Sequence, residues 1–270
     1  MEKKLWLEII SILFIDVKQK LITRNFLFAS LLMAGGSYLG TVGYGMDSCF
    51  DLFVTTLPAM SDFAVFDLTI TAFIASRSFC QDYHSGVFSF KLLREGIHRY
   101  TFSQTTSCIL SSVMITILAR IWFLVLLLLN GHPLSLTKFE LENNLSPNVF
   151  YYDRCMEQGN ILGAFLVVIF SAFLLNSICA LAGLAFSSWF MNPYVAWFVP
   201  YIFLLMYKIL FYHVKQEYRL DFIGQAGSVS HNVFINIIYA ASIATLHGLV
   251  LILIFYYGIK RRVNYGQLKE

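Results

Sequence analysis

Long apolar runs, broken by short polar segments, dominate this sequence. A membrane core about 30 Å thick needs roughly 20 mostly apolar residues for one helical crossing. Six windows meet this requirement, each bounded by charge, glycine or proline. They cover residues 26–44, 57–76, 104–129, 161–188, 193–212 and 233–258. The pattern predicts an all-α membrane protein with six transmembrane helices in a single transmembrane domain, residues 1–270.

The segment before the first window, residues 1–25, follows a different pattern. Apolar residues recur every three or four positions on one face, and polar residues fall on another. The apolar set is Trp6, Ile9, Ile10, Leu13, Phe14, Val17 and Leu21, and the polar set is Lys4, Glu8, Ser11 and Lys18. This pattern predicts an amphipathic helix in the membrane interface. The alternative is an extension of the first span, or a helix packed on the protein itself.

Composition excludes an ordinary soluble domain. Hydrophobic residues make up 58% of the chain and charged residues 13%, against about 45–50% and 25% in soluble domains. The formal net charge of +3 is too small to indicate nucleic-acid binding. The five Cys have no C-x-x-C or His/Cys ligand spacing, so no metal site is expected.

Positive charge gathers on one side of the predicted topology. The N-terminal arm, the loop after the second window and the C-terminal tail (259–270) hold Lys3, Lys4, Lys18, Lys20, Arg24, Arg77, Lys91, Arg94, Arg99, Lys260, Arg261, Arg262 and Lys269. The opposite loops hold only Lys138, Arg154, Lys215 and Arg219, among many acids. Short loops rich in Lys and Arg stay in the cytoplasm. We therefore expect a multi-pass protein of the cell membrane with both termini cytoplasmic.

The cytoplasmic loop 77–103 is unusually apolar for a solvated segment. Gly86 and Gly96 bracket a stretch long enough for a helix of two to three turns. Val87, Phe90, Leu93 and the neighbouring Leu92 would form one apolar face of that helix, and Lys91, Arg94 and Glu95 would stay polar. Such a face should dock on something, either a soluble partner or the bilayer interface.

The loop carries a pattern found in a known family. The pattern is Phe79-x-x-Asp82-x-x-x-Gly86, Leu92-Leu93-Arg94, then Arg99-Tyr100 and Ser103. With its place between spans two and three and the amphipathic N-terminal helix, it resembles the ABC type-2 permease family. The resemblance implies that this loop forms a coupling helix seated in a cleft of an ATP-binding ABC subunit. The family often has Lys where Gln104 stands.

The resemblance implies a function and a set of docking residues. The chain would be the permease subunit of an ATP-driven exporter, paired with a second permease protomer, identical or related, and working by alternating access. Its cargo would be apolar or amphipathic, for example an antimicrobial peptide, a drug or a lipid. The coupling-helix residues would be Phe79, Phe90 and Leu93 as anchors, Asp82 and Arg94 as charged register contacts, and Gly86.

The chain itself has no visible means of using ATP. It contains no G-x-x-x-x-G-K-[ST] phosphate loop and no H-E-x-x-H motif. We therefore expect no enzyme activity and no cofactor in this chain, with ATP and Mg held by the partner subunit.

Besides Lys208 near the outer end of the fifth window, three charged residues fall inside the predicted spans. Asp62 and Arg120 lie at similar depths from the cytoplasmic side, which predicts an ion pair between them. The alternative is that one of them lines the translocation path. Asp67 is a further path-lining candidate, and it would be the working acid if the chain were a self-sufficient secondary transporter or channel. An intramembrane enzyme lacks any convincing set of residues.

Two cysteines fall in the predicted external segments. Cys49 and Cys155 lie where oxidation is possible, and a disulfide between them is a hypothesis. Cys80, Cys108 and Cys179 fall in the cytoplasm or within spans.

Overall fold

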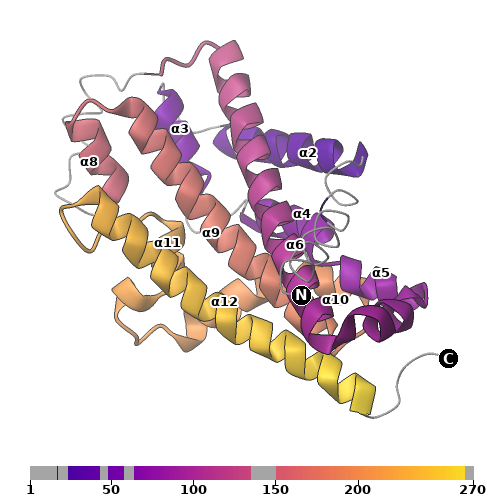
Figure 1. Cartoon of the computed structure of the whole chain (residues 1–270). Coiled ribbons are helices and arrows are strands. Elements are labelled where there is room, and N and C mark those ends of the chain that lie inside the picture. The colour runs from indigo at the N-terminus through magenta and orange to yellow at the C-terminus, as the bar shows by residue number, and fades with distance from the viewer. Residues whose placement is uncertain (1–16, 18–23, 43–47, 58–63, 135–149, 265–270) are drawn as a thin grey trace, which may run out of the picture.

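The computed structural model describes residues 17, 24–42, 48–57, 64–134 and 150–264. These residues form helices, with one isolated β-bridge between Phe150 and Gly227, so the predicted all-helical class is confirmed. In chain order the helices are α2 (Arg24–Thr41), α3 (Cys49–Thr55), α4 (Ala64–Ala75), α5 (Ser78–His84), α6 (Val87–Leu129), α8 (Tyr151–Glu157), α9 (Ile161–Ser187), α10 (Pro193–Leu210), the 3-10 helix η1 (Gln216–Tyr218), α11 (Leu220–Gly224) and α12 (Val233–Asn264) (Figure 1).

Four of the six predicted spans are helices long and apolar enough to cross a membrane. They are α6, α9, α10 and α12. The first two predicted windows contain α2 and α4, and α4 has only 12 residues where about 20 are needed. The α2 helix has 18 residues and lies across α6 in Figure 1. The four long helices indicate a membrane protein, and spans one and two stay predictions.

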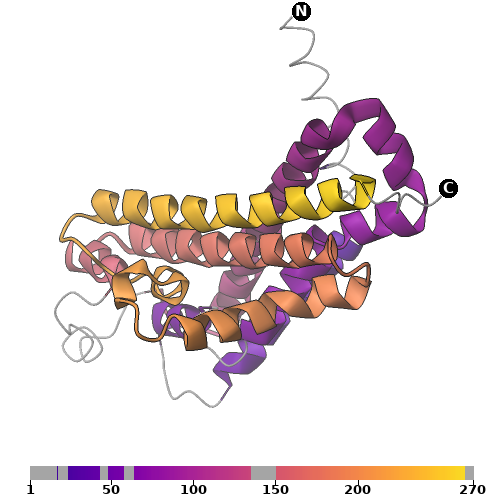
Figure 2. The same cartoon turned by 90° about the horizontal axis from the view of Figure 1, so that it is seen from below.

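The α9 helix lies at the centre of the molecule. It packs against α6, α10 and α12, and Figure 2 shows α12 running alongside it with α10 on its other side. Its sequence is rich in Ala, Ser and Gly between larger apolar residues, and nearly all of residues 171–185 are buried. Small residues let helices approach closely within a membrane. This is why a single helix can contact so many neighbours.

A tight turn joins α9 to α10 and is held from several sides. The Asn192 side chain accepts a hydrogen bond from the Tyr194 N–H at 2.9 Å, and Pro193 occupies the first helical turn. Arg262, near the end of α12, donates to the carbonyl oxygens of Ser188 at 2.6 Å and Trp189 at 2.9 Å. The α9–α10 turn and the end of α12 therefore lie at the same end of the molecule.

Short helices cover the opposite end, within the segments 131–160 and 213–232. The first segment contains α8, and the second contains η1 and α11. The backbone N–H of Tyr151 donates to the carbonyl of Ala226 at 3.0 Å, and the N–H of Cys49 donates to the carbonyl of Pro133 at 2.9 Å. These bonds tie α8 to the loop after α11, and α3 to the segment that follows α6.

Parts of two predicted segments lie outside the described residues. Of the expected interfacial helix, only residue 17 and the start of α2 are described. At the other terminus, α12 continues through Asn264 into the predicted tail.

Candidate functional site

The first part of α6 is a separate short helix. Gly96 interrupts α6 with φ 75° and ψ 163°, and Gly86 precedes the helix, also with φ 75°. Residues with a Cβ atom rarely adopt such backbone angles, so both ends favour glycine. The predicted bracketing is thus confirmed, and residues 87–95 form what we term the 87–95 helix.

The 87–95 helix has one apolar face that nothing in the described structure covers. Phe90 is 76% exposed and Leu93 82% exposed, and Val87 is also exposed. The Arg94 side chain borders them and is exposed as well. Large apolar side chains with exposures this high, held together on one helix face, are typical of a surface that binds something.

The opposite face of the 87–95 helix is buried. It consists of Phe88, Leu92 and Glu95. The Phe88 ring packs edge-on against Phe79 of α5, with ring centroids 5.4 Å apart, and against Tyr100 at 5.3 Å. The helix is therefore held firmly while its outer face stays open.

Phe79 is not part of the exposed surface. It is fully buried and packs edge-on against Phe255 of α12, at 5.4 Å between ring centroids. A residue in this position cannot reach a separate subunit, so the predicted docking role for Phe79 is wrong. Its ring instead connects α5 and the 87–95 helix to the end of α12.

Asp82 lies at the centre of a polar cluster beneath the 87–95 helix. Its carboxylate accepts hydrogen bonds from Lys91 Nζ at 3.0 Å, Tyr100 Oη at 3.3 Å and Gln104 Nε2 at 3.1 Å. Gln104 Oε1 also accepts from the hydroxyl of Ser78 at 2.9 Å. The predicted contact of Asp82 with a partner is therefore replaced by an internal one, which fixes α5, the 87–95 helix and the following span to each other.

A second polar cluster lies within the membrane-spanning region. Arg120 Nη2 lies 2.7 Å from Asp67 Oδ2, and both side chains are buried. Arg120 also donates to Thr56 Oγ1 at 2.6 Å and to the Thr56 carbonyl at 2.8 Å, and its guanidinium lies 5.7 Å from the centroid of the Phe53 ring. This arrangement satisfies most of the donors of a charge that would otherwise be costly in hydrocarbon.

The acidic partner of Arg120 differs from the predicted one. The structure pairs Arg120 with Asp67, whereas Asp62 lies outside the described residues. The depth argument assumed one continuous helix over residues 57–76, whereas Thr56 also contacts Arg120 and the described part of α4 is Ala64–Ala75. Asp67 thus lies in the first turn of α4, buried beside Arg120, and does not face an open path in this structure.

The hypothesised disulfide is absent from the structure. Cys49 and Cys155 are both buried free thiols in one apolar cluster at the α3 and α8 end. Burial raises the pKa of Cys49 to about 11, so its thiol stays protonated at neutral pH.

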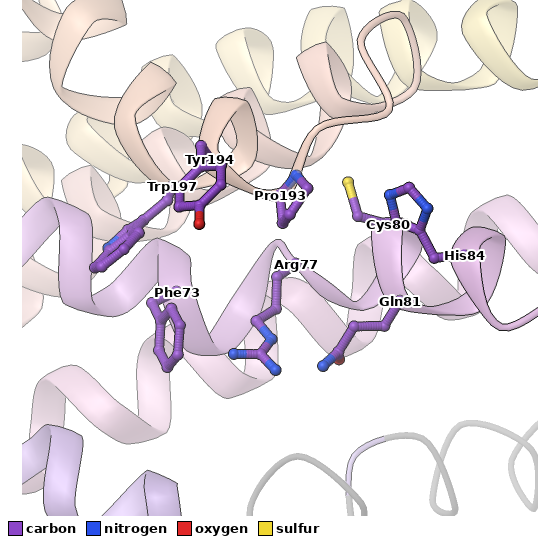
Figure 3. A pocket seen from close by; sticks show the side chains of 8 residues that line it. All are labelled: Phe73, Arg77, Cys80, Gln81, His84, Pro193, Tyr194 and Trp197. Carbon is purple, nitrogen blue, oxygen red and sulfur yellow. The ribbon is translucent and has the colours of Figure 1, made fainter.

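A cavity of about 410 Å³ lies between the α4–α5 junction and the start of α10 (Figure 3). Its lining residues are Phe73, Arg77, Cys80, Gln81, His84, Pro193, Tyr194 and Trp197. The sequence did not predict this cavity, because Arg77 and Trp197 are 120 positions apart and no motif links them. Within the described ranges, no group of His, Cys, Asp or Glu could hold a metal ion.

The chain matches no protein-family model, no curated protein and no solved structure. The function proposed below therefore rests on the contacts of the described residues.

Proposed function

We propose that this chain is the membrane-spanning permease subunit of an ATP-driven exporter. The 87–95 helix docks in a separate ATP-binding subunit, which holds ATP and Mg. Two permease protomers face each other around a path for an apolar or amphipathic cargo, and closure of the ATP-binding subunits reshapes that path.

The exposed face of the 87–95 helix is the observation that carries this proposal. A docking helix must present apolar side chains to its partner. It must also be held rigidly by the rest of the protein, so that movement of the partner is transmitted to the spanning helices. Phe90 and Leu93 supply the anchors. The Phe79 and Phe88 contacts and the Asp82 hydrogen bonds hold the helix rigidly. They connect it to the rest of α6 and to α12.

The position of this helix also supports the proposal. Figures 1 and 2 show the hook formed by α5 and the 87–95 helix projecting beyond the end of α9. Basic residues gather at this end: Arg77, Lys91, Arg94, Arg99, Lys260, Arg261 and Arg262. The excess of Lys and Arg favours a cytoplasmic position for this end, where ATP is available.

Co-purification tests the docking assignment. The tagged chain is extracted from its native membrane in mild detergent, and co-eluting proteins are identified by mass spectrometry and assayed for ATPase activity. We expect a stoichiometric ATP-binding protein with the wild type and its loss with Phe90→Asp, because a carboxylate cannot enter an apolar cleft cheaply. Tyr218→Asp, an exposed aromatic at the opposite end, is the matched control and should retain the partner.

Two results would contradict the proposal. Unchanged partner stoichiometry in Phe90→Asp would reassign the exposed face to the bilayer interface. An active wild-type preparation with no ATP-binding partner would favour a self-sufficient transporter, and the role of Asp67 would then be the next question.

A further inference from the structure

The cavity at the α4–α5 junction contains a cation that has no acidic partner among the described residues. Arg77 Nε and Nη2 donate to the amide oxygen of Gln81 at 2.9 and 2.5 Å, in the amide orientation that satisfies both side chains. The guanidinium also lies 4.6 Å from the centroid of the Phe73 ring. A neutral amide and a ring face position Arg77 without neutralising its charge, so the cavity favours an anion.

Aromatic side chains of α10 form the other wall of this cavity. The Trp197 ring packs on Phe73 with centroids 5.2 Å apart, and Tyr194 is largely exposed beside it. The side of the cavity formed by α10 is therefore largely aromatic, with Pro193, Tyr194 and Trp197 in its lining.

The surroundings of the cavity are positively charged. Arg262 and Arg261 contact the α9–α10 turn next to it, and the nearby carboxylate of Asp82 is already bonded to Lys91. The cavity also lies where α4 ends and α10 begins, at the boundary of the spanning helices. Arginine, tryptophan and tyrosine at such a boundary are the groups that bind lipid headgroups.

We propose that this cavity binds the phosphate headgroup of an anionic phospholipid from the cytoplasmic leaflet. Arg77 contacts the phosphate oxygens, and Trp197 and Tyr194 contact the glycerol and ester region. A volume of about 410 Å³ falls in the range of small-ligand sites, and the open side beside Tyr194 lets the acyl chains continue into the bilayer. The proposal concerns a different surface from the 87–95 helix and does not depend on the exporter assignment.

Native mass spectrometry of the delipidated full chain, with any co-purified partner, tests the proposal. The protein is titrated with phosphatidylglycerol or with phosphatidylcholine carrying the same acyl chains. We expect the wild type to bind one phosphatidylglycerol that Arg77→Gln binds about tenfold more weakly, because a charge-assisted contact is lost. Arg77→Lys should fall between them. Arg99→Gln, which removes an exposed arginine at the same end outside the cavity, should match the wild type.

Tryptophan fluorescence locates the bound lipid. The difference in fluorescence between the wild type and Trp197→Phe gives the emission of Trp197. Brominated phosphatidylglycerol should quench this emission more than brominated phosphatidylcholine does. Arg77→Gln should abolish that difference, with an unchanged melting temperature in phosphatidylcholine showing that the variant is folded. If that variant does not fold, Arg77→Lys should reduce the difference between the two brominated lipids without abolishing it.

Three outcomes would overturn the lipid assignment. Equal phosphatidylglycerol binding by wild type and Arg77→Gln would exclude Arg77 from any headgroup site. Equal quenching by both brominated lipids would mean that Trp197 contacts bilayer lipid without selecting its headgroup. Binding of soluble glycerol phosphate as tight as that of phosphatidylglycerol, and equally dependent on Arg77, would assign the cavity to a soluble phosphate compound.

Discussion

At the scale of single residues, the buried pair of Arg120 and Asp67 is the contact whose loss should lower the stability of the protein most. Both side chains are almost fully buried, at 1% and 4% exposure. Removing one partner of such a pair leaves an uncompensated charge, which costs about 3–5 kcal/mol. We expect Asp67→Asn to lower the melting temperature in mild detergent strongly, since the amide and the two Thr56 oxygens can accept from Arg120 but do not neutralise its buried charge.

A double variant separates a structural role from a transport role. Asp67→Asn with Arg120→Met removes both charges, so most of the lost stability should return. Transport should return with it if the pair only holds α4 against α6. A stable double variant without transport would contradict this view and make Asp67 a working acid.

The sequence predicted an acidic partner for Arg120, but it indicated Asp62, whereas the structure pairs Arg120 with Asp67. Counting residues from a helix end converts to depth only if the helix is continuous and steep. Thr56 and Asp67 both contact Arg120, and this convergence of two separate positions on one side chain is a long-range contact that residue counting does not predict.

At the scale of elements, Gly96 determines the direction of the 87–95 helix. Its φ of 75° with ψ of 163° lies in a region that is essentially reserved for glycine, and forcing another residue there costs about 1–3 kcal/mol. Gly96→Ala should either destabilise the protein by that amount or straighten α6 and move Phe90 and Leu93. Thermal unfolding measures the first effect and loss of the ATP-binding partner the second.

Gly86 provides the matched comparison. Its φ of 75° and ψ of −5° are close to the left-handed helical region, which asparagine tolerates. Gly86→Asn should therefore be milder than Gly96→Ala in both measurements. Equal stability and equal partner binding in Gly96→Ala and the wild type would show that the break in α6 does not depend on this residue.

The α8 helix carries a predicted pH dependence. Burial, and to a smaller extent Glu157, raises the pKa of Asp153 from 3.8 to about 6, against the opposing effects of the Phe150 N–H and Arg154. Between these values the folded state holds a proton that the unfolded state releases, so stability should fall as pH rises from about 4 to about 6. Above about pH 6 the stabilising contribution of the Asp153 proton is fully lost.

Substitution of Asp153 tests this slope. Asp153→Asn keeps an acceptor for the Phe150 N–H and removes the charge. Near neutral pH it should be more stable than wild type by about 1–2 kcal/mol, allowing for partial exposure, and near pH 4 the two should agree. Melting temperatures across this range would show parallel curves if Asp153 were not the responsible group.

Local signals predicted this set of elements well, and long-range contacts were the part that sequence could not supply. Gly86 and Gly96 act on their own backbone, so their residue type predicted where the 87–95 helix begins and ends. Phe79 has the same apolar character as Phe90, but it is buried because Phe255 of α12 packs against it. A periodicity within one loop contains no information about that distant partner.

At the scale of the whole molecule, the charges sort into two ends. The α5 and 87–95 helices, the α9–α10 turn and the end of α12 are joined by bonds such as His84 Nε2 to the Met191 carbonyl at 3.0 Å. The opposite end, around α8 and α11, carries an excess of acids: Asp51, Asp153, Glu157, Glu217 and Asp221. Because α6, α9, α10 and α12 are each long and apolar enough to cross a membrane and run between these ends, the sorting of charge by end does not require α2 or α4 to cross.

Cysteine labelling of intact cells tests this orientation. The five native thiols are buried, so an exposed cysteine introduced at either end gives the main signal. Lys215→Cys should react with a membrane-impermeant maleimide in intact cells, whereas Arg94→Cys should react only after permeabilisation. The opposite pattern would place Phe90 and Leu93 outside the cell, where no ATP-binding subunit can reach them, and would overturn the exporter proposal. The same pattern would also move the Arg77 cavity to the outer leaflet, so one experiment tests the setting of both sites.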